Sequence, residues 1–251
     1  MSVFRTLVAA HIATGAVGLA LFWVAVGSRK GGKVHRDWGH VFAYSMLVTG
    51  CIAAGMGLTT LADPVGTHPH LQDRALVTGI FGWMMVYLAV LTVSLAWHGL
   101  QVVRHKRRHE ANRQPRDVAL QVLVIVAAVN CAVQGWLRGL PLMMGISVVG
   151  IASGGTNLFF CFRAAPPKWA YLVEHMKALV GAGISVYTAF MTFGLVRFMP
   201  RTGPANAHAA LNPRLWAIPL AIGLSIIFYH HYQIHTWYRR GRSTRVEVRE
   251  A

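Results

Sequence analysis

Histidine is the residue type in this sequence whose number and placement could support chemistry, with 13 copies among 251 residues. Several of these histidines stand where long apolar segments begin or end, so they would share one depth if those segments were antiparallel helices. Neutral imidazole is the commonest metal ligand in proteins and an axial ligand of haem iron. We therefore predict a metal or b-type haem site near one membrane boundary. Its predicted cofactor ligands are His40, His98, His175, His230 and His231.

A second set of histidines is predicted to bind a non-haem transition metal. His231 and His235 are four residues apart, a spacing that places both side chains on one face of a helix. The predicted metal ligands are His35, His175, His231 and His235. The alternative interpretation is that these histidines lie at the membrane interface and bond to lipid headgroups, as amphipathic side chains do there. Electron transfer is the predicted reaction class if haem is bound.

A different set of polar residues lies deep within the apolar segments. A polar side chain at such depth needs a partner inside a helical bundle. These residues could form hydrogen bonds between helices, or they could line a polar pocket in a transporter or an accessory membrane subunit without metal. The set comprises His11, Asn130, Gln134, Asn157 and Tyr187.

The composition indicates a membrane protein. The chain is 55% hydrophobic and only 13% charged, whereas soluble domains carry about 25% charged residues. From Thr6 to Gly27 no residue has a formal charge, and this stretch could cross about 30 Å of hydrocarbon at about 1.5 Å per residue. We predict an all-α polytopic bundle, one integral membrane domain over 1–251. Its seven predicted spans are 6–27, 38–62, 75–97, 118–137, 139–162, 177–198 and 214–236, followed by a tail, 243–251, that is expected to be mobile.

The net charge of +16 comes from basic residues between the spans rather than from a face suited to nucleic acid, so no nucleic-acid partner is expected. Alternate connections hold 18 Lys and Arg on one side and 6 on the other. By the positive-inside rule this bias predicts an external N-terminus, a cytoplasmic C-terminus and a bacterial inner-membrane location. Anionic lipid headgroups are the predicted partners of the basic loops, at about 1 kcal/mol per residue. A homo-oligomer or a partner membrane subunit is compatible with the pattern.

The acidic residues give a further expectation. All eight Asp and Glu residues fall in predicted loops, at span boundaries or in the tail. Ion-coupled transporters usually place an ionisable group near the middle of the membrane. The predicted spans therefore lack the usual sequence mark of transport.

Two stretches carry a family resemblance. The first runs from His11 to Tyr44 and holds His, an apolar span, Lys-Gly, His-Arg, Gly and an aromatic residue; the second runs from Glu174 to Gly194 and contains Thr-Ala-Phe. Both resemble an uncharacterised bacterial family of predicted multi-pass membrane proteins, a domain of unknown function. The resemblance implies a multi-helix membrane fold and no assigned activity. The positions that it marks as of interest are His11, His35 and His175.

Overall fold

The computed structural model describes residues 2–195 and 211–250, and every long element in these ranges is helical. The long α-helices are α1 (Ser2–Gly27), α2 (Lys33–Ala62), α5 (Met85–Arg104), α6 (Pro115–Arg138), α7 (Pro141–Phe162), α8 (Ala170–Ala189) and α10 (Pro213–Glu250). The short elements are α3 (Pro64–Thr67), α4 (Arg74–Leu76), the π-helices η1 (Val77–Met84) and η3 (Phe190–Gly194), and the 3₁₀-helix η2 (His109–Arg113).

Seven helical segments are long and apolar enough to cross a membrane, so the predicted all-α, seven-span membrane fold is confirmed. The third span starts near its predicted position, at Arg74, and continues through α4, η1 and α5 to Arg104, beyond the predicted end at 97. The sixth begins at Ala170 rather than at 177; its predicted end at 198 lies outside the described residues. The last helix continues to Glu250, so the tail is helical up to that residue; its expected mobility stays a prediction.

The new bounds change the place of one acidic residue. Glu174 lies four residues inside the span Ala170–Gly194, whereas it was predicted to precede that span. Asp117 lies in the first turn of α6, at the boundary as predicted. Glu174 was placed outside because it interrupts the apolar pattern from which the start of the sixth span was predicted.

Glycine, proline and aspartate residues mark where several helices end or begin. Gly139 ends α6 in the left-handed region, with φ of 64°, and Pro141 then opens α7 in the first turn, where its missing N–H costs nothing. Asp63 and Asp73 cap the short helices α3 and α4 with their carboxylates, the usual role of Asp at a helix start. The α6–α7 connection is therefore a tight hairpin.

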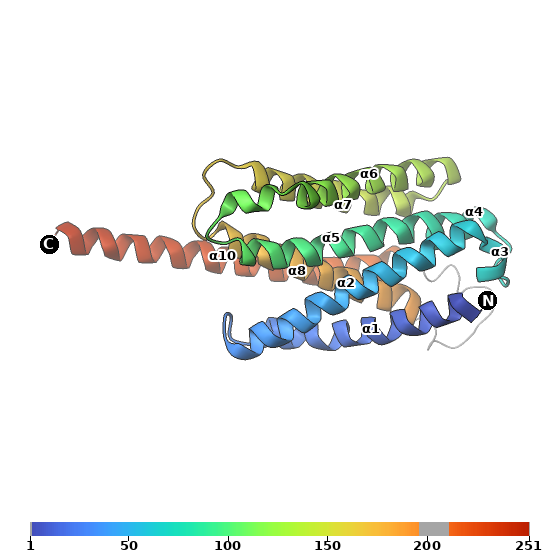
Figure 1. Cartoon of the computed structure of the whole chain (residues 1–251), viewed down its shortest axis with the longest axis horizontal. Coiled ribbons are helices and arrows are strands. Elements are labelled where there is room, and N and C mark those ends of the chain that lie inside the picture. Colours follow the sequence, from blue (N-terminus) through green and yellow to red (C-terminus); the bar gives the residue numbers. More distant parts are fainter. Residues whose placement is uncertain (1, 196–210, 251) are drawn as a thin grey trace.

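The helices pack around α5 (Figure 1). The α1–α2 hairpin contacts it through α2, the α6–α7 hairpin contacts it mainly through α6, and α8 packs on it and carries α10. Glycines permit close approach: a Cβ on Gly50 would lie 2.6 Å from Val93 Cγ2, and one on Gly150 would lie 2.5 Å from the Tyr87 ring. Small residues at such contacts are typical of membrane bundles.

Successive helices cross the bundle in opposite directions, so every second connection lies at the same end. The turn 28–32, the connection 105–114, the segment 163–169 and the C-terminal end of α10 lie at one end of the bundle, which we call the basic end. Figure 1 shows α10 extending beyond the other helices on this side. The histidines predicted as ligands all belong to this end or to the helix turns next to it.

Candidate functional site

Two of the predicted ligands meet at the basic end. His35 lies in the first turn of α2, and His175 lies in the second turn of α8. Their ring centroids are 6.3 Å apart and the ring planes cross at 76°. Both side chains are partly buried. Two helices that are far apart in sequence thus bring one imidazole each to the same place.

The hydrogen bonds of this pair leave the same nitrogen available on each ring. His35 Nδ1 lies 3.0 Å from the carbonyl oxygen of Ala25, and His175 Nδ1 lies 2.8 Å from that of Gly99. A carbonyl oxygen can only accept, so each Nδ1 carries the hydrogen and each neutral ring keeps the Nε2 lone pair. Metal-ligating histidines usually show this arrangement, in which a backbone carbonyl fixes the tautomer.

A lysine lies beside the pair. Lys30 Nζ donates to the carbonyl oxygens of Ala25, at 3.2 Å, and of Val26, so it covers the C-terminal carbonyls of α1. Partial burial lowers the pKa of Lys30. Its charge acts on both His35 and His175. The pair therefore lies in a positive environment.

The other predicted ligands are distributed over three places. His40 is exposed but lies within electrostatic range of His175, and His230 is within range of Lys30. His231 and His235 lie beside the Trp169 ring, at centroid distances of 6.5 and 5.8 Å. His98, on α5, lies near Glu174 of α8 instead. In the described parts of the chain, no three His, Cys, Asp or Glu side chains are arranged to hold a metal ion.

His98 belongs to a second, buried cluster between α5, α7 and α8. Glu174 Oε2 lies 2.6 Å from Lys177 Nζ and 3.6 Å from His98 Nε2. Lys177 also donates to Thr156 Oγ1 at 3.2 Å. The side chains of His98, Glu174 and Lys177 are only 4%, 14% and 26% exposed. An ion pair so placed within a membrane span is a candidate functional group in its own right.

Buried polar side chains continue from this cluster between α5, α6 and α7. Gln121 Oε1 accepts from Ser94 Oγ and from Asn157 Nδ2, each at 3.0 Å. Trp97 Nε1 donates to Asp117 Oδ1 at 2.6 Å. One oxygen of Asp117, one oxygen of Asn157 and the amide nitrogen of Gln101 are buried without a hydrogen-bond partner among the described residues.

An apolar layer closes this network on its inner side. Val124, Met84 and Met143 are completely buried, and Tyr87 is nearly so. The Tyr87 hydroxyl donates to the carbonyl oxygen of Ile146 at 2.8 Å. Apolar side chains therefore lie on the side of the network that is away from the basic end.

Sequence reasoning missed most members of this network. Their signal is the spacing of Ser94, Trp97, His98 and Gln101, which are at i, i+3, i+4 and i+7 on one face of α5. Such a stripe of polar residues in an otherwise apolar helix predicts a buried polar contact with neighbouring helices.

The predicted polar pocket residues have separate partners. His11 Nδ1 lies 3.3 Å from the Thr49 carbonyl oxygen, and Tyr187 donates to the Leu19 carbonyl oxygen at 2.8 Å. Gln134 contacts Asn130, one turn away on α6, and also receives a hydrogen bond from Arg138. Asn157 belongs to the network with Gln121. In the described parts of the chain no hydrogen bond joins these side chains into one pocket, apart from the Asn130–Gln134 contact.

The fold defines a multi-pass α-helical membrane protein. No protein-family model, curated protein or solved structure matches the chain. The resemblance to an uncharacterised bacterial membrane family therefore stays a prediction, and the arguments about function rest on the geometry of the two clusters.

Proposed function

We propose that the protein binds a b-type haem through His35 and His175 and acts as a membrane electron-transfer protein. The observation that carries the proposal is the pair of imidazoles, each with its Nδ1 on a backbone carbonyl and its Nε2 available. Two imidazoles that bind one metal at about 2.0 Å, with about 1.1 Å from each nitrogen to its ring centre, have centroids about 6 Å apart. The ring centroids of His35 and His175 are 6.3 Å apart, so the two rings are within the distance that such a pair of ligands requires.

The number of ligands favours haem over a bare metal ion. A structural zinc site needs four protein ligands, and the described residues offer no group of three. A haem iron would need only two ligands from the protein, which His35 and His175 could supply. His40 and His230 are near enough to Lys30 and His175 to serve as neighbours of such a group.

A porphyrin would need space next to the pair. An apolar slot of about 60 Å³ lies deeper between α1, α8 and α10, and its lining includes Phe22, Gly183 and Gly223. A porphyrin occupies several hundred Å³, the size of ordinary cofactor pockets, so its binding would have to part α10 from α8. The window of α10 that would cross the membrane is only 17% buried, and Pro219 interrupts its hydrogen bonds. Both features lower the cost of such a displacement.

The proposed orientation in the membrane is argued from the distribution of basic residues. The proposal puts the basic end in the cytoplasm of a bacterial cell and the N-terminus outside, by the positive-inside rule. Electrons would then be exchanged near the cytoplasmic surface, where anionic lipid headgroups neutralise the basic loops.

Spectroscopy tests the proposal. We expect the detergent-purified protein, expressed with sufficient haem, to show a Soret band and an α-band after reduction with dithionite. His35→Ala and His175→Ala should each remove most of the haem, because one axial ligand is lost. His231→Ala is the matched control and should retain it, since His231 lies beside Trp169 instead. A well-folded, colourless and metal-free protein would contradict the proposal, as would equal haem content in all three variants.

The second candidate function is a transporter without metal. The observation that favours it is the buried Glu174–Lys177 ion pair with His98 inside the membrane spans, since intramembrane ionisable residues often mark ion pathways. A colourless protein whose reconstituted vesicles change internal pH, with the change lost in Glu174→Gln, would favour this function.

A further inference from the structure

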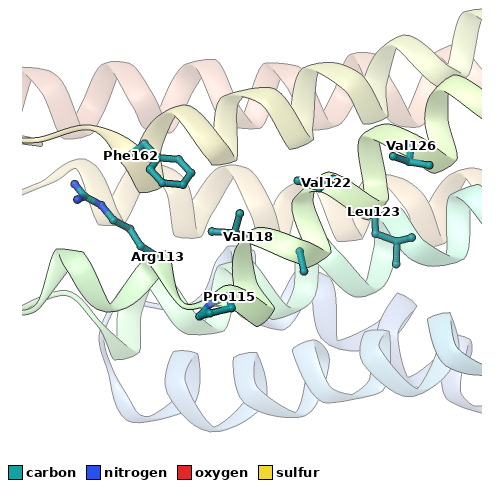
Figure 2. Close-up of a pocket in the computed structure, with 8 residues that line it drawn as sticks. Arg113, Pro115, Val118, Val122, Leu123, Val126 and Phe162 are labelled. Carbon is teal, nitrogen blue, oxygen red and sulfur yellow. The ribbon is translucent and has the colours of Figure 1, made fainter.

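A lipid-facing groove runs along α6 toward the basic end (Figure 2). It has a volume of about 620 Å³, and its wall is almost entirely apolar apart from one arginine at its mouth. Its principal lining residues are Arg113, Val118, Val122, Leu123, Val126 and Phe162. The groove belongs to neither the histidine pair nor the buried ion pair.

The shape of the groove suits an acyl chain. Val118, Val122 and Val126 are four residues apart and form one straight row on α6, which extends over about 12 Å of membrane depth. This length fits within one leaflet of a bilayer whose hydrocarbon core is about 30 Å thick. Val126 and Phe162 are each 57% exposed, so the groove opens toward the surrounding lipid.

Arg113 is held in position at the mouth. Its Nε donates to the Cys161 carbonyl oxygen at 2.8 Å, and its Nη2 donates to the Arg163 carbonyl oxygen at 3.4 Å. These bonds cover the C-terminal carbonyls of α7 and fix the plane of the guanidinium. In the described parts of the chain, Arg113 forms no ion pair and its Nη1 has no hydrogen-bond partner.

Two more arginines are sequence neighbours of the groove lining, Arg116 next to Pro115 and Arg163 next to Phe162. Arg163 is exposed; the Arg116 side chain is 58% exposed and its guanidinium lies over the Trp97 ring. Among the described residues, the carboxylate paired with any of the three is Asp117, at 4.0 Å from Arg116, so positive charge remains in excess. A fixed guanidinium is well suited to a phosphate group, which it can bind with parallel hydrogen bonds.

We propose that this groove binds a phospholipid with an anionic headgroup, drawn from the leaflet at the basic end. The phosphate would contact Arg113 Nη1, and one acyl chain would lie along the valine row. A zwitterionic lipid would bring its own cation to the mouth, where the arginines repel it. A free phosphate ion would leave the apolar groove unused. The combination of fixed charge and adjacent groove therefore selects an anionic lipid.

Lipid retention tests this proposal. The full-length protein would be reconstituted in nanodiscs that contain equal amounts of phosphatidylglycerol and phosphatidylcholine, then transferred to detergent and analysed by native mass spectrometry. We expect retained phosphatidylglycerol to exceed phosphatidylcholine. Arg113→Gln should lower this retention about tenfold, the usual effect of losing one charge-assisted hydrogen bond. Val122→Trp should lower it similarly by filling the groove.

The control is Val148→Trp, which adds the same bulk at an exposed position of α7 that does not line the groove. It should retain lipid like the wild type, and Val122→Trp keeps the test valid if Arg113→Gln fails to fold. Equal retention in Val122→Trp and Val148→Trp would overturn the proposal. Equal retention of the two lipids would overturn the charge selection. Displacement of the lipid by inorganic phosphate alone would show an ion site instead.

Discussion

The buried ion pair predicts a specific pattern of stability. Glu174 and Lys177 are 2.6 Å apart and only 14% and 26% exposed. Glu174→Gln would leave the lysine without its carboxylate in a poorly solvated place, and breaking a buried pair in this way typically costs about 3–5 kcal/mol. Lys177 keeps its contact with Thr156, so we expect a loss near the lower limit, about 3 kcal/mol.

A double variant that combines Glu174→Gln with Lys177→Met measures the coupling between the two charges. Lys177→Met should cost about 2 kcal/mol, because Glu174 then keeps only His98 as a neighbour. The two changes together should cost no more than Glu174→Gln alone, since neither charge is then left unpaired. The cycle should therefore give a coupling energy of about 2 kcal/mol.

The assay is reversible unfolding in mixed micelles, followed by tryptophan fluorescence and circular dichroism. Glu110→Gln is the matched control, because Glu110 is exposed on η2, and it should leave the unfolding midpoint unchanged. Strictly additive losses in the double variant would refute the reasoning. A Glu174→Gln protein as stable as the wild type would refute it as well.

Three further predictions address other parts of the molecule. Gln121→Leu should cost about 2–3 kcal/mol in the same assay, because it leaves Asn157 and Ser94 without their shared acceptor. Burial lowers the pKa of His68 to about 4; because the unfolded pKa is about 6.5, stability from the neutral ring is complete above about pH 6.5 and is lost as the pH falls toward 4. His68→Phe should remove this part of the pH dependence of thermal unfolding. A single cysteine in 28–32 of a cysteine-free protein should react only from the cytoplasm, and one in 63–73 only from outside.

The first two of these predictions have matched controls, and the third has a contradicting outcome. Val122→Leu changes an exposed neighbour of Gln121 and should not affect stability. His70→Gln should change the acid sensitivity less than His68→Phe, because the His70 charge makes the smaller contribution to the His68 pKa. Reaction of both inserted cysteines from the same side would contradict the proposed orientation.

The seven spans could be predicted because length and apolar composition together define a membrane helix. The ends of the third and sixth spans could not, since Gln101 and Glu174 are polar and break the apolar pattern. These side chains are stable in the membrane helices because other helices cover them; His98 of α5, for example, lies 3.6 Å from Glu174 of α8. Such partners depend on tertiary packing, which the local pattern does not contain.

The pairing of His35 with His175 likewise could not be predicted from the local sequence. The sequence indicated His35 and His175 as candidates among several histidines, because type and position at helix ends are local properties. Their pairing depends on how α8 packs against α5 and on the turn between α1 and α2, which brings His35 to the Ala25 carbonyl. His98 and His175, by contrast, were predicted to act together but have different partners: His98 lies near Glu174, and His175 lies near His35.

The apolar layer beneath the polar network has an electrical consequence. Val124, Met84 and Met143 are fully buried and apolar, so we expect more of a transmembrane voltage to fall across the side of the bundle away from the basic end. Glu174 lies only four residues into its span, about 6 Å or one fifth of the hydrocarbon thickness. Crossing the whole membrane changes the energy of one charge by about 2.3 kcal/mol per 100 mV, so Glu174 experiences about 0.5 kcal/mol. Charges at the basic end therefore remain close to the potential of the adjoining solution, and chemistry there would respond only weakly to membrane voltage.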